Sequence, residues 1–243
     1  MTQFPDYPGL TVKLAEEDDE ILVARRLHAA CYLDTGYVGE DDLEDGVIND
    51  PWVPFSDYYL AIDELDGSAV GTCRSIKPSV AGFPAFQLND IYPEALEVFR
   101  GLDPNLCIEC ASLATTRDGL QNTAISAALY RRFWQDAVLG HRAYLLAFLD
   151  NRLLRILHRW LKWPWQPIGP EVDYLGSMST PAALSIPKTI ERARRDHPEA
   201  LAFFSGDIPF SELTHVELDL RDQAPDLATA VIPSGKPRSG FGD

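Results

Sequence analysis

The acid Glu109 lies within an otherwise apolar run, Cys107–Ala114 (CIECASLA). The composition of this run predicts a β-strand. Half-burial in such a strand would raise the pKa of the carboxyl group toward the range that a general base needs near neutral pH. The alternative is a strand carboxylate that points to solvent or pairs with Arg74 on a neighbouring strand. Glu109 is therefore a candidate catalytic base.

Three further charged residues could bind a small polar ligand. Arg74 lies within a second predicted strand, Ala69–Ile76, and could bind a carboxylate or position Glu109. Its alternative is a solvent-facing place on the strand. Asp50 and Asp57 could bind an ammonium group, or they could be solvated loop acids in a very acidic segment.

The cysteines offer weaker chemistry. Cys107 and Cys110 form a C-x-x-C motif, while Cys31 and Cys73 stand alone. A structural zinc site needs a second pair or suitably spaced histidines. A redox C-x-x-C motif opens a helix after a strand, whereas this one lies inside a predicted strand. We therefore expect small buried hydrophobic residues, reduced thiols and no metal site.

The charge distribution is uneven along the 243 residues. The formal net charge of −16 argues against a general binder of nucleic acid or anionic membranes. Residues 1–66 carry three basic and seventeen acidic side chains, a net charge of −14. Residues 131–162 carry seven basic and two acidic side chains, a net charge of +5. A short basic segment within an acidic chain needs an explanation.

Much of that basic charge falls on one predicted helix, over residues 152–162 and capped by Asn151. Four cations there have the spacing i, i+3, i+7 and i+10, which gives one stripe on the helix. Such a stripe could bind an acidic partner, or it could be an ordinary solvated helix face. The four cations are Arg152, Arg155, Arg159 and Lys162.

Periodicity and turn signals give the elements that must position these residues. A long acidic stretch, residues 34–54, is expected to be a loop with a short helix near Asp41. The order of elements predicts an α/β fold with a mixed sheet. The expected helices are 21–32, 93–99, 122–139, 152–162 and 187–204 with a break before Pro198, and the expected strands are 58–63, 69–76, 107–114, 144–149, 182–186 and an edge strand over 214–220.

The chain length fits one large domain with an extension. We expect a core domain over residues 1–186, an extension over 187–232 packed on it, and a disordered tail over 233–243. No segment has the length and apolar character of a membrane span, and no secretory signal is visible. We therefore expect a cytoplasmic protein.

The order of elements and four sequence stretches resemble the GNAT N-acyltransferase superfamily. The resemblance covers residues 20–186 and is narrowest to the acyl-homoserine-lactone (autoinducer) synthases and the long-chain N-acyl amino acid synthases. It implies a three-layer α/β/α fold with a central mixed, partly splayed sheet. The four stretches are 59–74, 108–115, 122–162 and 163–170, the last reading WPWQPIGP.

The resemblance also implies roles for the residues. Glu109 matches the glutamate of the family's Glu-x-Ser-Arg signature, so it would be the base that removes a proton from the amine substrate. The Ser-Arg pair falls on Ala111-Ser112. The residues that match positions shaping the amine site are Arg25, Arg26, Tyr37, Asp50, Asp57 and Ser112, and Arg74 is a further candidate for binding that substrate.

The identity of the two substrates stays open. Autoinducer synthases use S-adenosylmethionine as the amine and make bacterial quorum-sensing signals, and residues 163–186 favour that branch. The missing arginine at Ser112 and the loose match of the N-terminal helix favour an N-acyl amino acid synthase or a different, uncharacterised amine. The segment 115–122 (TTRDGLQN) lacks the spaced glycines of a CoA-binding loop, which favours acyl carrier protein over acyl-CoA as the acyl donor. No tightly bound cofactor is implied.

Two other functions remain possible readings of the same sequence. One is a CoA-dependent acetyltransferase of the general GNAT type, and the other is an inactive GNAT-like binding module. In an acyltransferase, several aromatic residues could line an acyl tunnel, although helical spacing is more typical of plain core. These aromatic residues are Trp52, Phe133, Trp134, Phe148 and Trp160.

Overall fold

The computed structural model describes residues 7–161, 163–224 and 227. Its centre is a mixed β-sheet with the strand order β1-β4-β5-β6-β7-β10-β8, and β9 pairs with β10. Neighbouring strands are antiparallel except β6 and β7, which are parallel. The strands are β1 (Leu10–Leu14), β4 (Ser56–Asp63), β5 (Ala69–Ile76), β6 (Cys107–Thr115), β7 (Tyr144–Asp150), β8 (Gln166–Pro167), β9 (Val172–Tyr174) and β10 (Ser177–Ser185).

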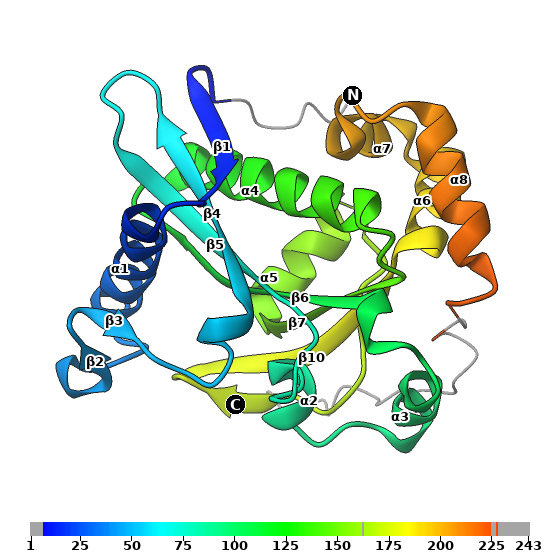
Figure 1. The fold of residues 1–243 in the computed structure, drawn as a ribbon, viewed down its shortest axis with the longest axis horizontal. Helices are drawn as coiled ribbons and strands as arrows, with labels where there is room; N and C mark the ends of the chain where they lie inside the picture. Colours follow the sequence, from blue (N-terminus) through cyan, green and yellow to red (C-terminus); the bar gives the residue numbers. More distant parts are fainter. Residues whose placement is uncertain (1–6, 162, 225–226, 228–243) are drawn as a thin grey trace, which may run out of the picture.

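Helices cover both faces of this sheet (Figure 1). Tyr58 of β4 packs in a cluster under α1 (Asp18–Asp34), whereas the next residue, Tyr59, packs edge-on against Phe133 of α4 (Gly119–Leu139). Because successive side chains of a strand point to opposite faces, α1 and α4 lie on opposite faces of the sheet. The expected three-layer α/β/α arrangement is confirmed.

Helix α4 approaches the sheet closely at Gly71 of β5. A Cβ atom at Gly71 would lie 2.5 Å from Ile125 Cγ2 of α4, so a larger residue there would push the helix away. The far end of α4 is capped by Gly140, as predicted. The close approach at Gly71 fixes the position of α4, which forms one wall of the site described below.

The sheet opens along β6. Its parallel pairing with β7 ends at Cys110–Ala147. On the other side, the register between β5 and β6 shifts, so that Ser112 and Leu113 lie opposite Cys73 alone. Ser112 has a φ of 54°, a left-handed conformation that disfavours residues with a side chain. This bulge turns β6 away from β7, and the sheet is splayed as expected.

The acidic segment between α1 and β4 is more ordered than the predicted loop. It contains the short helix expected near Asp41 and also a small hairpin, which pairs Leu43 with Ile48. Two short helices follow β5, one at the bottom centre and one at the lower right of Figure 1. The elements are η1 (Glu40–Asp42), β2 (Leu43–Glu44), β3 (Val47–Ile48), η2 (Val53–Phe55), α2 (Pro84–Gln87) and α3 (Pro93–Arg100), with η3 (Pro104–Leu106) before β6.

Helix α5 (Asn151–Ile156) continues into a π-helical turn, η4 (Leu157–Leu161). The prediction of a helix over 152–162 is confirmed as far as Leu161, although its second part is a π turn, and the prediction of Asn151 as its cap is wrong. The cap is Asp150, whose carboxylate accepts from two backbone N–H groups of the first turn at 2.7 and 3.1 Å. The π turn places one extra residue in the helical turn, so the ideal spacing of the basic stripe is not kept beyond α5.

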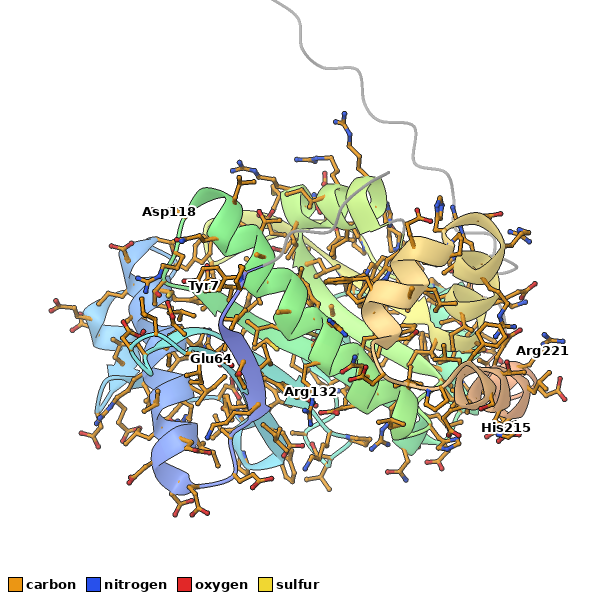
Figure 2. The ribbon with its side chains drawn as sticks, turned by 90° about the horizontal axis from the view of Figure 1, so that it is seen from above. Tyr7, Glu64, Asp118, Arg132, His215 and Arg221 are labelled. Atoms are coloured by element: carbon orange, nitrogen blue, oxygen red, sulfur yellow. The ribbon has the colours of Figure 1, made fainter. Side chains whose placement is uncertain are left out.

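Three helices follow the sheet: α6 (Ile186–Asp196), α7 (Pro198–Ser205) and α8 (Phe210–Arg221). The break before Pro198 is confirmed. Helices α7 and α8 pack against α4, and Figure 2 shows His215 and Arg221 of α8 at one end of the molecule.

The prediction of an edge strand over residues 214–220 is wrong, since these residues belong to α8. Leu213, Val216 and Leu220 are buried on one side of that helix. Their spacing of three and four residues is the helical period, and a strand would place them on both faces. The first strand, β1, was not predicted because Leu10–Leu14 has only a short alternation.

The described residues of both the core domain and the extension contribute to one hydrophobic cluster. The tail over 233–243 lies outside the described residues. Among the helices that the structure describes, none has the length and apolarity to cross a bilayer.

Candidate active site

Three cavities surround the splayed part of the sheet. The aromatic cavity, of about 310 Å³, lies at the open ends of β6 and β7 and reaches between α4 and α5. The polar cavity, of about 250 Å³, lies on the side of α1 and α2. The edge cavity, of about 220 Å³, lies between α1, the end of β6 and the start of α4. The aromatic and polar cavities share Tyr32, Ala111, Ser112 and Phe148, so molecules bound in both would meet at the Ser112 bulge.

Seven of the 18 residues that line the aromatic cavity carry aromatic rings. Phe133 and Phe148, two of the aromatic residues predicted for an acyl tunnel, line it, whereas Trp52 lines the polar cavity and Trp134 is buried in the core. The side chain of Trp160 lies outside the described residues. The aromatic lining residues are Tyr32, Tyr37, Tyr130, Phe133, Phe148, Trp163 and Trp165.

Glu109 forms part of the wall of the polar cavity and is only 1% exposed. Its two carboxylate oxygens accept from the backbone N–H of Ala85 in α2, at 3.1 and 3.0 Å. Burial raises the pKa of Glu109 to about 8, against smaller lowering effects of the Ala85 N–H and the Arg74 charge. A carboxyl group with this pKa can exchange a proton near neutral pH.

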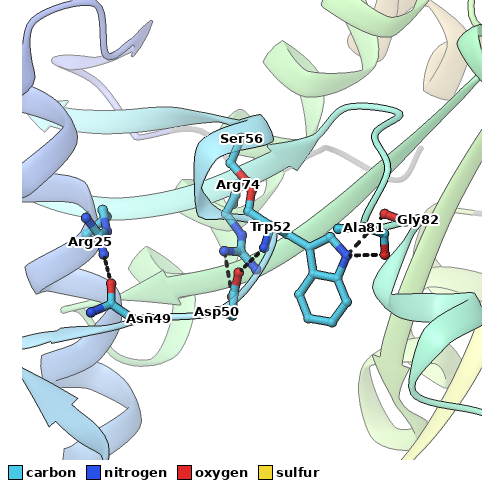
Figure 3. A network of polar contacts seen from close by, with 8 residues as sticks. All are labelled: Arg25, Asn49, Asp50, Trp52, Ser56, Arg74, Ala81 and Gly82. Carbon is cyan, nitrogen blue, oxygen red and sulfur yellow. Dashed lines mark hydrogen bonds and ion pairs between the residues drawn. The ribbon is translucent and has the colours of Figure 1, made fainter.

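Arg74 and Asp50 form an ion pair in the same cavity, with Nη1 and Oδ2 separated by 2.8 Å (Figure 3). Asp50 also accepts from the backbone N–H of Trp52 at 2.8 Å. The indole of Trp52 donates to the carbonyl oxygens of Ala81 and Gly82. This network fixes the segment before β4 to the loop before α2, so the cavity wall is held from two sides.

The polar cavity is also lined by three residues that were not predicted to belong to a site, His28, Tyr32 and Tyr174. Burial, with a smaller effect of the Arg74 charge, lowers the pKa of His28 to about 3. The imidazole is therefore neutral, and its ring packs edge-on against Tyr32 with centroids 4.1 Å apart. The spacing of His28 and Tyr32, i and i+4 on a predicted helix, was the available signal.

The remaining residues predicted for the amine site lie at different distances from it. Arg25 donates to the side-chain oxygen of Asn49, which lines the polar cavity, so Arg25 supports the wall from behind. Arg26 is exposed and lines none of the three cavities. Asp57 forms an ion pair with Lys77 at 2.8 Å, outside the cavity lining.

Two predicted residues lie nearer the junction of the cavities. Tyr37 lines the aromatic and edge cavities, and its ring packs edge-on against Tyr32. Ser112 lies where the aromatic and polar cavities meet. The structure therefore brings Asp50, Arg74, Glu109 and Ser112 together around one cavity.

The predicted docking residues lie on and after α5. Arg152, Arg155 and Arg159 are exposed, and Arg152 also lines the aromatic cavity. Lys162 lies outside the described residues. Arg152 therefore places one exposed cation at the aromatic cavity, and Arg155 and Arg159 follow it along α5 and η4.

Cys107 and Cys110 are buried free thiols. Burial raises the pKa of the Cys107 thiol to about 12. Across residues 7–161, 163–224 and 227, no cluster of three or more His, Cys, Asp or Glu side chains is arranged to hold a metal ion. The interpretation of these cysteines as buried small hydrophobic residues agrees with their place in the core.

Comparison with solved structures gives the fold. FeeM, an N-acyl amino acid synthase from uncultured soil microbes, aligns with a TM-score of 0.58 and 17% identity over 75% of this chain and 93% of its own. BjaI, a CoA-dependent acyl-homoserine lactone synthase solved with SAM and isopentyl-CoA, aligns with a TM-score of 0.60 and 16% identity over 86% of this chain and 100% of its own. The synthase LasI aligns with a TM-score of 0.56 and 13% identity over 72% of this chain and 89% of its own.

Searches at the sequence level, against protein-family models and against curated proteins, find no match. The likeness to FeeM, BjaI and LasI confirms the resemblance at the level of the fold. This chain therefore has the architecture of acyl-homoserine lactone and N-acyl amino acid synthases.

Proposed function

We propose that this protein is an N-acyltransferase that moves an acyl group from a thioester to the amine of an amino acid. The observation that carries the proposal is the meeting of the aromatic and polar cavities at the Ser112 bulge, with buried Glu109 in the wall of the polar cavity. The acyl chain would occupy the aromatic cavity and the amine would occupy the polar cavity. The two reacting atoms would then be held together, which removes much of the entropic barrier.

The reaction needs one proton acceptor and one oxyanion site. The amine nitrogen attacks the thioester carbonyl, Glu109 takes the proton that the nitrogen loses, and the C–S bond breaks to release a thiol, which regains a proton. The pKa of about 8 suits Glu109 to this exchange. Backbone N–H groups of β6 beyond Cys110 that are not paired with β7 would stabilise the oxyanion.

The size of the polar cavity favours an amino acid over S-adenosylmethionine as the amine. Cavities that hold drug-sized ligands measure about 300–1,000 Å³, and this one measures about 250 Å³. Arg74 would bind the carboxylate of the amino acid, because guanidinium groups pair well with carboxylates. S-adenosylmethionine is the second candidate, since BjaI was solved with SAM.

The acyl donor in this proposal is a carrier-protein thioester. Acyl carrier proteins are acidic, and α5 and η4 carry three exposed arginines, of which Arg152 lines the aromatic cavity. Asp118 is the N-cap of α4, where an anionic side chain would repel a CoA diphosphate. A simple acetyl group would leave most of the 310 Å³ cavity unfilled, which disfavours a general acetyltransferase.

The test is to incubate the purified protein with octanoyl thioesters of acyl carrier protein or CoA and a mixture of amino acids and S-adenosylmethionine. Mass spectrometry of the products and detection of the free thiol then report the reaction. We expect an N-octanoyl amino acid and one equivalent of thiol per product, with the faster rate from the carrier protein. An acylated lactone would support the second candidate amine, and release of thiol without any amide would contradict the proposal.

A further inference from the structure

The tight turn between β9 and β10 contains a leucine in an unfavourable conformation. Tyr174 pairs with Ser177, so the turn consists of Leu175 and Gly176. Their φ angles are 52° and 77°, which define a type I′ turn. Asparagine or glycine is strongly preferred at the first position of such a turn, because a branched side chain is strained at positive φ.

Among the described residues with positive φ, Leu175 is the aliphatic one. The other non-glycine residues with positive φ are Asp45, Ser112 and His141. Asp and His tolerate this conformation better than aliphatic residues do. Ser112 lies at the junction of the aromatic and polar cavities, so the backbone strain at Ser112 lies within the candidate active site.

Leu175 also belongs to the candidate active site, because it lines the polar cavity while remaining 37% exposed. The neighbouring Tyr174 lines the same cavity and packs on Phe148, with ring centroids 4.8 Å apart. This ring contact holds the turn against the cavity. An asparagine would satisfy the backbone of the turn but would not supply an apolar surface.

The lining of the polar cavity contains both ionisable and aliphatic side chains. The ionisable ones include Asp50, Arg74 and Glu109, which could bind the ammonium and carboxylate of an amino acid. The aliphatic ones come from four separate segments. These side chains are Val38, Ile48, Leu88 and Leu175.

We infer that Leu175 determines the specificity of the polar cavity, by selecting an amino acid with an apolar side chain. This inference rests on the proposed function and adds the class of amino acid. The apolar side chain of the substrate would contact these aliphatic residues and cover Leu175, so burial of both surfaces would favour leucine or phenylalanine over serine or glycine. The strain of the turn is retained because the apolar side chain there provides that contact, which asparagine or glycine would not.

Leu175→Asn separates this role from a structural one. If Leu175 serves specificity, the variant gains stability, because asparagine suits the turn, and its melting temperature rises by about 2–4 °C. The dissociation constants for L-leucine and L-phenylalanine increase by about fivefold to tenfold, while those for L-serine and glycine change by less than twofold. Calorimetric titration of the free amino acids measures these constants without turnover.

The matched control is Asp45→Asn, which places the same residue at the first position of the Asp45-Gly46 turn, also with two positive φ angles. Asp45 lines none of the three cavities, so neither stability nor selectivity should change. A lower melting temperature for Leu175→Asn, or unchanged discrimination between leucine and glycine, would overturn the inference. So would a wild-type protein that binds leucine no better than glycine. Selective binding without any acyl transfer would refute the proposed function and leave this inference standing.

Discussion

For Glu109, the sequence predicts an unusual environment but not the hydrogen-bond partner. An acid alone in an apolar strand had to be either exposed or perturbed, and burial in the structure selects the second alternative. Its partner, the Ala85 N–H, comes from a helix of four residues that sequence periodicity cannot detect. His28 and Leu175 were missed for a related reason, because each becomes part of the polar cavity only when distant segments meet.

Substitution of Glu109 by glutamine is expected to stabilise the protein at alkaline pH. The folded-state pKa of about 8 lies above the ordinary value of 4.5, so the folded protein holds a proton that the unfolded chain releases between these values. The free energy of unfolding of the wild type should therefore fall as pH rises through this window, by up to about 1.4 kcal/mol per pH unit. Glutamine keeps an oxygen that can accept from Ala85 N–H and does not titrate.

The measurement is urea unfolding of both proteins from pH 5 to pH 9. The difference in unfolding free energy, variant minus wild type, should grow with pH and level off above about pH 8. A difference that stays constant across the range would show that the carboxyl group of Glu109 titrates normally.

At the scale of elements, regular segments were predictable and irregular ones were not. The hairpin β4–β5, the helix α4 and the strand β7 follow from Asp66-Gly67, a clear helical period and a continuous apolar run. The π turn after α5 and the bulge at Ser112 depend on tertiary packing, which leaves no local sequence signal. These irregular elements are the ones that shape the aromatic cavity.

The exposed arginines of α5 and η4 are expected to matter only for a carrier-protein donor. Reversal of two charges, Arg155→Glu with Arg159→Glu, should lower kcat/KM for an acyl carrier protein thioester about tenfold at low salt. The same variant should use acyl-pantetheine, which carries no protein, as well as the wild type does. Added salt should lower the wild-type rate with the carrier protein and narrow the difference.

Arg192→Glu on α6 is the matched control, since Arg192 is exposed and lines none of the three cavities. Its rate with the carrier protein should stay close to that of the wild type. An equal loss with acyl-pantetheine in the double variant would mean that these arginines support the fold or the cavity rather than docking.

For the whole molecule, the net charge of −16 matters less than its distribution. The acidic segment over residues 1–66 supplies α1, β3 and Asp50, which form one side of the polar cavity. The basic segment over residues 131–162 supplies α5, which borders the aromatic cavity. The sequence shows the uneven distribution of charge, and the fold places the acidic and the basic segment at different cavities.

In the proposed function, this arrangement would let two substrates approach the sheet from different sides and meet at the bulge. An ammonium group is attracted to the acidic segment, and an acidic carrier is attracted to the basic one. Both cavities reach Ser112 where the strands splay, and the polar cavity also reaches Glu109.

The pH dependence of acyl transfer in the wild type and in Glu109→Gln tests the central claim most directly. With a fixed acyl thioester and a saturating amino acid, we expect wild-type kcat/KM for the thioester to rise with pH to a plateau, with an inflection near the Glu109 pKa of about 8. The variant should lose this inflection and at least about 100-fold in rate. A variant that keeps the wild-type rate and the same inflection would contradict the assignment of Glu109 as the base.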